Sequence, residues 1–192
     1  MIRIAVVGHL ARSSGDFSIN DLPGAAGRMD VLCRCVNSSF FLSHDLRRDV
    51  ECFLVLCGEP DPPKTIKISG RDVKHLNPDE RTTAALLKKA LSMVTGTKFR
   101  ESTPGIFVRR GGLKELAQDF SFSVLDEGGS DIRSESKLPE AYILSDHLNF
   151  SPAENEILSG MPACSVGPQL LHADHTISVL FNEIDRRRAG WA

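Results

Sequence analysis

The sequence predicts one α/β domain, built on an open and mostly parallel sheet, over residues 1–192. Short β-branched runs alternate with segments whose apolar residues recur at helical spacing, which is typical of βαβ units. The composition, 41% hydrophobic and 25% charged, is that of an ordinary globular domain large enough to bury a core. No internal repeat or low-complexity segment divides the chain.

Four strands are predicted in the first part of the chain. Ile2–Gly8 and Val50–Gly58 are short apolar runs typical of buried strands. Thr65–Ser69 alternates polar and apolar residues, which predicts a half-exposed strand, and Gly105–Arg110 predicts a further one. The polar segment His9–Gly24 is expected to form a loop after the first strand.

Three helices are predicted among these strands. Gly27–Leu42 carries apolar residues at helical spacing, and Leu113–Phe120 predicts a short helix. The remaining helix is expected to begin at Asn77, with Asn77 as N-cap, Pro78 in the first helical position and Glu80 closing a capping box.

The last third of the chain predicts two strands, Ala141–Ser145 and Ala163–Gly167, and two helices. Ser151 begins the first helix by the same capping logic. The final helix ends in three arginines and places five apolar residues on one face: Ala173, Ile177, Leu180, Phe181 and Ile184. Ser121–Pro139 is the segment most typical of a loop.

The net charge hides an asymmetry. The 23 basic and 25 acidic residues nearly cancel, which argues against a strongly basic nucleic-acid binder. Residues 1–112, however, hold 17 basic and 12 acidic residues, and residues 113–192 hold 6 and 13. Such a split is a reason to look for two partners, although a compact domain with two different faces would show it too.

The cysteines and the N-terminus indicate a reducing, cytoplasmic setting. The five cysteines form no C-x-x-C pair, and those within apolar runs are expected to be free and structural. Residues 1–8 are too short for a signal peptide, and no apolar run approaches the roughly 20 residues that cross a membrane. The two histidines of the segment 172–175 are three apart, not four, so no metal is expected there.

The common nucleotide and nucleophile motifs are absent. No G-x-G-x-x-G, Walker A or G-x-S-x-G pattern occurs, which disfavours dehydrogenase, P-loop and α/β-hydrolase chemistry. Two loops follow predicted strands, near Ser145 and Val166, and the segment near Leu125 offers a third; together they could surround one small ligand. The arginines of the first half could bind phosphate or form structural ion pairs with the aspartates between them.

Seven segments in order along the chain carry a resemblance to a known family. They are Gly8-His9-x-Ala11, Gly15–Gly24, Gly27–Asp30, Ser43-His44-x-x-Arg47-x-Asp49, Asn77–Arg81, Leu144–His147 and Leu171–His175. Together they resemble the archaeal tRNA pseudouridine-54 N1-methyltransferase family, of the knotted SPOUT methyltransferase superfamily. A related family methylates the same nitrogen of pseudouridine in ribosomal RNA, which leaves a second substrate class open.

The resemblance implies a parallel sheet with a C-terminal trefoil knot, a homodimer with tRNA across its interface, and S-adenosylmethionine held by the knot loops. Nine positions carry over as cofactor contacts: Leu125, Ser145, Val166, Gly167, Pro168, Gln169, Leu170, Leu171 and Thr176. The family commonly has Gly in place of Ser145 and often Cys in place of Thr176. The first departure is expected to narrow the cofactor pocket.

The chemistry of pseudouridine suggests the catalytic residues. Its N1 carries a proton and becomes a nucleophile only when an acceptor takes or holds that proton, so no covalent nucleophile is needed. Asp21 and Asp30 are candidate acceptors, and Arg28 is a candidate to steady the uracil carbonyls or a phosphate. Candidate phosphate contacts are Arg12, Arg34, Arg47 and Arg48. A noncatalytic RNA-binding module and an enzyme of small molecules are the alternatives.

Overall fold

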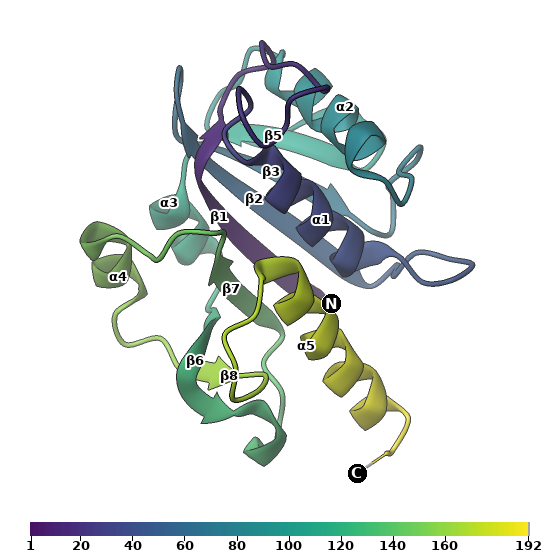
Figure 1. Cartoon of the computed structure of the whole chain (residues 1–192), viewed down its shortest axis with the longest axis vertical. Helices are drawn as coiled ribbons and strands as arrows, with labels where there is room; N and C mark the ends of the chain where they lie inside the picture. Colours follow the sequence, from purple (N-terminus) through teal and green to yellow (C-terminus); the bar gives the residue numbers. More distant parts are fainter. Residues whose placement is uncertain (192) are drawn as a thin grey trace.

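The computed structural model describes residues 1–191, which contain one eight-stranded sheet of order β4-β5-β3-β2-β1-β7-β6-β8 (Figure 1). The strands are β1 (Ile2–Arg12), β2 (Val50–Gly58), β3 (Lys64–Ser69), β4 (Arg100–Thr103), β5 (Ile106–Arg110), β6 (Ser123–Asp131), β7 (Ala141–Ser145) and β8 (Ala163–Ser165). The helices are α1 (Met29–Phe40), α2 (Glu80–Leu91), α3 (Leu113–Asp119), α4 (Pro152–Leu158), α5 (Ala173–Arg188) and the 3-10 turn η1 (Ile132–Ser134).

The sheet is parallel over the larger part of its width, as predicted. Strands β2, β1, β7, β6 and β8 run parallel to one another. Strands β3, β5 and β4 continue the sheet in antiparallel pairs. The reason lies in the connections: α1 carries the chain back between β1 and β2, whereas residues 59–63 between β2 and β3 are too few for a crossover.

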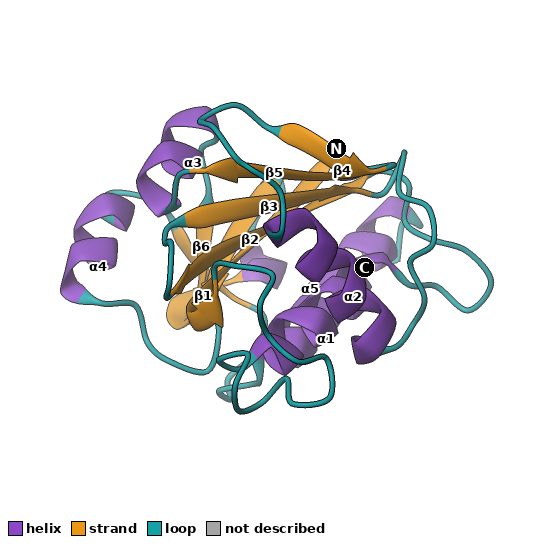
Figure 2. Ribbon diagram, turned by 90° about the horizontal axis from the view of Figure 1, so that it is seen from above, coloured by secondary structure: helices purple, strands orange, loops and turns teal. Residues whose placement is uncertain are grey.

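Helices cover both faces of the sheet. Ile4 and Val6 of β1 pack with the buried residues of α1, α2 and α5, and these helices group together in Figure 2. Ala5 and Val7, which point the other way, pack with residues of α3 and α4. Strand β1 is therefore buried on both faces, as its unbroken apolar sequence predicts. No helix in the described part of the chain is long and apolar enough to cross a bilayer.

The predicted half-exposed strand is buried. Thr65, Ile66 and Ile68 of β3 have almost no exposed surface, because β5 extends the sheet beyond β3. Two polar residues of the alternating pattern form hydrogen bonds within the protein: Thr65 Oγ1 donates to the Gly111 carbonyl (2.8 Å), and Ser69 Oγ donates to Asp72 Oδ2 (2.9 Å). Strand β4, which the sequence analysis does not predict, pairs with β5.

The two predicted helix starts have different outcomes. Helix α4 begins as predicted, with Ser151 as N-cap, Pro152 in the first turn and Glu154 completing a capping box. For α2 the prediction of Asn77 as N-cap is wrong, because Asp79 takes that place and its Oδ1 accepts from Thr82 N (2.7 Å). A carboxylate also interacts favourably with the positive end of the helix dipole, which an amide does not.

The prediction of a loop over Ser121–Pro139 is wrong. Strand β6 and the turn η1 lie there, because β6 pairs with both β7 and β8. The pairing with β8 is irregular between Leu125 and Ser130, where the sequence contains two glycines. A Cβ atom on Gly129 would lie 2.6 Å from the backbone N of Cys164, so the glycines mark a bulge where two backbones approach closely.

The carboxyl end of β1 is fitted tightly between two glycines. A Cβ atom on Gly58 would lie 2.2 Å from the Leu10 carbonyl oxygen, and one on Gly27 would lie 1.8 Å from the same atom. Gly27 also has a φ of +66°, which other residues adopt at a cost. The start of α1 therefore packs directly on the backbone of β1.

We expect Gly27→Ala to lower the free energy of unfolding by about 2–4 kcal/mol, because it adds the cost of a left-handed residue to a backbone clash. Chemical denaturation followed by circular dichroism measures the change. Gly96→Ala is the matched control, since a Cβ atom there meets nothing within 4 Å. Equal stability of the two variants would contradict the tight fit.

Candidate functional site

A cavity of about 540 Å³ lies where β7 and β8 end and α5 begins, beside the irregular part of β6. The carboxyl ends of parallel strands are where α/β sheets bind ligands, and the predicted loops near Ser145 and Val166 meet there. The segment near Leu125, predicted to be a loop, belongs to β6 but also lines the cavity. The structure brings eight of the nine predicted cofactor positions to the wall of this cavity: Leu125, Ser145, Val166, Gly167, Gln169, Leu170, Leu171 and Thr176. Pro168 is not among the lining residues.

The cavity combines apolar walls with acidic groups. Leu144 and the carboxylate-bearing residues Asp126, Glu127 and Asp146 line it together with the predicted leucines. A Cβ atom on Gly167 would meet nothing within 4 Å, so the backbone of this loop borders open space. Such a surface suits a ligand that has a flat apolar part and a positive charge.

The two residues that depart from the family pattern are bound to their own surroundings. The Ser145 hydroxyl donates to the Leu148 carbonyl within the same loop. Thr176 Oγ1 donates to the His172 carbonyl, one helical turn earlier (3.2 Å). Both side chains line the cavity, and both hydroxyl groups form hydrogen bonds with backbone oxygens of neighbouring residues.

The histidines at the start of α5 form no metal site. His172 stands at the N-cap without a capping hydrogen bond from its side chain, and its ring centroid lies 5.8 Å from that of His175. Within residues 1–191, no group of three His, Cys, Asp or Glu side chains could hold a metal ion. All five cysteines are free, and burial raises the pKa of Cys52 to about 12, so its thiol is protonated and unreactive at neutral pH.

Asp30 and Arg28, two of the predicted catalytic residues, form a close pair. Arg28 precedes α1 with a φ of 63°, and its Nε and Nη2 donate to the two Asp30 oxygens (3.0 and 3.1 Å). Arg34 Nη1 also donates to Asp30 Oδ2 (3.0 Å). Burial raises the pKa of Asp30, but the hydrogen bonds from both arginines outweigh it, so the pKa lies below its usual value and the side chain is ionised.

The Asp30 pair is not among the residues that line the cavity, but Arg34 and Asp174 connect it to the start of α5. Arg34 extends from Asp30 to Glu80 of α2 (3.1 Å) and to Asp174 of α5 (3.7 Å). Asp174 follows Ala173, which lines the cavity. Asp21 is placed differently: it is exposed, and its carboxylate accepts from the backbone N–H groups of Gly24 and Ala25 (3.1 and 2.9 Å).

Three of the four predicted phosphate-binding arginines lie at opposite ends of the central strands, and the fourth, Arg34, lies in α1. Arg12 ends β1 on the cavity side and forms an ion pair with Asp16 (2.8 Å). Arg47 and Arg48 precede β2, and β1 and β2 start side by side. Because a strand advances about 3.3 Å per residue, the length of β1 separates the two groups by roughly 30 Å.

Arg47 and Arg48 differ in exposure. The side chain of Arg47 is 12% exposed, donates to both carboxylate oxygens of Asp185 (2.8 and 2.6 Å), and has its guanidinium carbon 4.4 Å from the centre of the Phe181 ring. Arg48 is 52% exposed and donates to the Gly70 carbonyl (3.2 Å). Of these two side chains, Arg48 is therefore the one that faces solvent.

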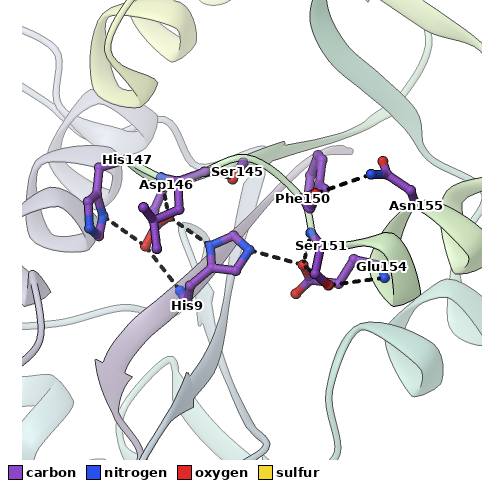
Figure 3. Close-up of polar contacts among 9 residues, drawn as sticks. His9, Ser145, Asp146, His147, Phe150, Ser151, Glu154 and Asn155 are labelled. Atoms are coloured by element: carbon purple, nitrogen blue, oxygen red, sulfur yellow. Dashed lines mark hydrogen bonds and ion pairs between the residues drawn. The ribbon is translucent and has the colours of Figure 1, made fainter.

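The sequence analysis misses one polar group beside the cavity. His9 of β1 lies between Asp146, in the loop after β7, and Glu154 of α4 (Figure 3). Its Nδ1 is 2.8 Å from Asp146 Oδ1, and its Nε2 is 3.0 Å from Glu154 Oε2. No spacing rule connects residues 137 and 145 positions apart, so the family motifs containing His9 and Asp146 are the available signal.

The chain matches known proteins along its length. The family described as "Putative SAM-dependent RNA methyltransferase" matches residues 1–189. A protein of Methanocorpusculum labreanum, named tRNA (pseudouridine(54)-N(1))-methyltransferase, is 56% identical over 97% of this chain and 98% of its own. A protein of the same name from Methanospirillum hungatei is 46% identical, with both chains covered completely.

A solved structure has the same fold despite a dissimilar sequence. Archaeoglobus fulgidus Nep1, crystallised with S-adenosylhomocysteine, superposes with a TM-score of 0.68 at 14% identity and covers 98% of both chains. At this identity the likeness concerns the fold alone. The whole-length family match and the two relatives at 46% and 56% identity lead to one conclusion: the chain belongs to the SAM-dependent RNA methyltransferase family.

Proposed function

We propose that this protein transfers a methyl group from S-adenosylmethionine to N1 of pseudouridine 54 in the T-loop of tRNA. The observation that carries the proposal is the whole-length similarity to relatives bearing that name, at identities from 38% to 56%. The cavity between β6 and the ends of β7 and β8 supports it, because eight of the nine residues carried over from the family line its wall.

The cavity suits S-adenosylmethionine, which when bound supplies a methyl group activated by a positively charged sulfonium. Leu125, Leu144 and Leu171 would pack against the adenine ring, and the Gly167 backbone would border it closely. The carboxylates of Asp126 and Glu127 place negative charge on the cavity wall, where it favours a cation. We propose that the segment carrying these loops threads the trefoil knot of SPOUT enzymes.

Asp30 is our first candidate for the acceptor of the N1 proton. During methylation N1 would bond to the methyl carbon as the bond from that carbon to the sulfonium sulfur breaks, which leaves S-adenosylhomocysteine. The N1 proton passes to a carboxylate oxygen and then to water. The described ion pairs give Arg28 one acidic partner, Asp30. Arg34 has three, because Glu80 and Asp174 face it as well as Asp30. Arg28 would therefore turn to the uracil carbonyls or a phosphate, which frees Asp30 for N1. Asp21 is the second candidate, because its exposed oxygens have lone pairs left.

We propose that the tRNA lies over the edge of the sheet that carries the cavity. Arg12 and Arg34 would contact phosphates near the flipped base, and Arg48 would contact the backbone farther away. We propose that Arg47 contacts RNA at the same distant end of the sheet, where a phosphate would replace the Asp185 carboxylate as its partner. A homodimer of single-domain chains spanning residues 1–192, acting in the cytoplasm, completes the proposal.

The substrate is tested with two transcripts that differ only at position 54. We expect methylation of tRNA carrying pseudouridine 54 and none of tRNA carrying uridine 54, because uridine has no N1–H. Mass spectrometry of the digested RNA detects the product. Equal labelling of both RNAs would exclude the specificity, and cofactor binding without any transfer would favour a noncatalytic module. An enzymatic rate that changes neither with added RNA nor with salt concentration would favour an enzyme that acts on small molecules.

The cofactor site is tested with Gly167→Leu. The new side chain would occupy the cavity, so we expect at least about tenfold weaker binding of S-adenosylhomocysteine, which corresponds to roughly 1.4 kcal/mol. Isothermal calorimetry measures the affinity. Gly96→Leu is the control, since it too adds a side chain in open space but away from the cavity. Unchanged affinity in the Gly167 variant would place the cofactor elsewhere.

The acceptor is tested with Asp30→Asn. We expect the rate of methyl transfer to fall about 100-fold, within the range of general-base losses, while the affinity for S-adenosylhomocysteine changes less than about threefold. Glu80→Gln, which removes the other carboxylate next to Arg34, is the control and should keep most activity. A fully active Asp30 variant would transfer the role to Asp21.

Asp30 also predicts a pH dependence of stability. Its pKa is lowered in the folded protein, so its contribution is present above the unfolded pKa and is lost as the pH falls through the folded pKa. Denaturation of wild type and Asp30→Asn at pH 7 and pH 3 should show a difference of about 1–3 kcal/mol that shrinks at the lower pH. A constant difference would contradict the ionised state.

A further inference from the structure

We infer that His9 is a positioning residue: it bridges Asp146 and Glu154 and so fixes the loop 145–150 in the shape that the cavity requires. The inference rests on the proposed function in one respect, namely that this cavity binds S-adenosylmethionine. His9 is not among the described residues that line the cavity, and its side chain is only 14% exposed. Any effect on the cofactor must therefore pass through the residues that it holds.

The first half of the bridge organises the loop after β7. The side chain of Asp146 is 1% exposed and accepts from the His9 backbone N (3.0 Å) as well as facing the His9 ring. Asp146 Oδ1 also accepts from Leu148 N (3.0 Å), which bends the loop back on itself. His147 Nδ1 lies 3.2 Å from the other oxygen. The buried carboxylate of Asp146 thus connects β1, through His9, to residues 146–148 of the loop.

The second half of the bridge fixes the start of α4. Glu154 Oε2 faces His9 and also accepts from Ser151 N and Ser151 Oγ (both 2.8 Å), which caps the helix. The Phe150 ring packs edge-on against the His9 ring at 6.5 Å between centroids. Asn155 donates to the Phe150 carbonyl (3.1 Å), as Figure 3 shows. The far end of the loop is therefore tied to the same histidine.

The segment between these two ties forms one wall of the cavity. Its lining residues are Ser145, Asp146, His147, Leu148, Asn149, Phe150 and, from α4, Asn155. A loop with few apolar contacts is held mainly by such polar ties. Releasing either carboxylate from His9 would let the wall move relative to β1.

The bridge is complete only when the ring is charged. A neutral imidazole has one N–H, so one of the two carboxylates would face a lone pair, whereas an imidazolium donates to both. The hydrogen bond to Asp146 raises the pKa of His9 against the opposing effect of burial. Burial raises the pKa of Asp146 and of Glu154, but hydrogen bonds from His9 and from backbone N–H groups lower both overall.

The other titratable groups around the bridge do not replace this charge. His147 faces Asp146 from the loop, and Arg28 acts on Asp146 from the start of α1. From β2, Cys57 lies near both carboxylates, and burial raises its pKa to about 11, so it stays neutral. Because the folded pKa of His9 is raised, the bridge is present below the unfolded value near 6.5 and is lost as the pH rises through the folded pKa.

The decisive experiment compares the pH dependence of S-adenosylhomocysteine affinity between wild type and Glu154→Gln. Between pH 6 and pH 9 we expect wild-type affinity to fall about tenfold, the effect of losing one charged hydrogen bond. In Glu154→Gln the second charge is gone and the amide can donate to the neutral ring, so we expect a change below about twofold. Protonation of the ligand itself affects both proteins equally, so it does not contribute to the difference between the two pH profiles. Identical profiles would overturn the inference.

Three further variants separate positioning from stability. Glu115→Gln alters the matching capping box of α3 without contacting His9, so it should keep the wild-type profile. His147→Asn removes the second histidine that faces Asp146 and should keep the wild-type pH profile. His9→Asn, whose amide cannot reach both carboxylates, should bind weakly at every pH. A flat profile in the His147 variant would assign the effect to His147 instead.

Two measurements on the protein without ligand keep the inference testable if the proposed function fails. Nuclear magnetic resonance of the His9 ring should give a pKa above 6.5, falling in Glu154→Gln. Amide hydrogen exchange of residues 145–150 should quicken in His9→Asn, relative to exchange in β2. If neither wild type nor any variant binds S-adenosylhomocysteine, the proposed function is wrong. The two measurements then still show whether His9 bridges Asp146 and Glu154 and orders the loop 145–150. An unshifted His9 and unchanged exchange would refute it.

Discussion

The burial of β1 on both faces is the constraint on which the rest of the molecule depends. Its alternate residues belong to two separate cores, and its two edges pair in parallel with β2 and β7. A strand fixed on four sides has one possible register, because a shift by one residue would exchange the contents of both cores. Its carboxyl end then places His9 beside the loop that follows β7.

The charge asymmetry along the sequence has a structural use inside the protein. Three ion pairs between an arginine and an acidic residue join α5 to residues 1–112: Arg47 with Asp185, Arg34 with Asp174, and Arg188 with Asp49. All three hold α5 to the first half of the chain, so the opposite charges of the halves partly neutralise each other. Contacts within the protein therefore account for part of the asymmetry, which does not by itself require two partners.

Sequence reasoning predicts what short-range chemistry decides. The bounds of β2 and β7 are predicted to the residue, and the apolar face of α5 and the cap of α4 follow from periodicity and from Ser151 with Glu154. It fails where distant pairing decides: β6 forms despite its glycines because β7 and β8 lie beside it, and β3 is buried because β5 continues the sheet. The cavity loops are predicted because they follow strands, whereas the contact of His9 with Glu154 spans two elements that no local pattern relates.

The first turn of helix α5 lines the cavity. Its last turns form ion pairs with the first half of the chain, through Asp185 with Arg47 and through Arg188 with Asp49. The cavity wall therefore depends on the segment that a ribosome makes last among the described elements. During synthesis the N-terminal strands and α1 can assemble first, because domains fold from the end that emerges. A nascent chain that still lacks residues 163–188 has no β8 and no α5, and so no enclosed binding site. Truncated products of interrupted translation would hence be unable to sequester the methyl donor.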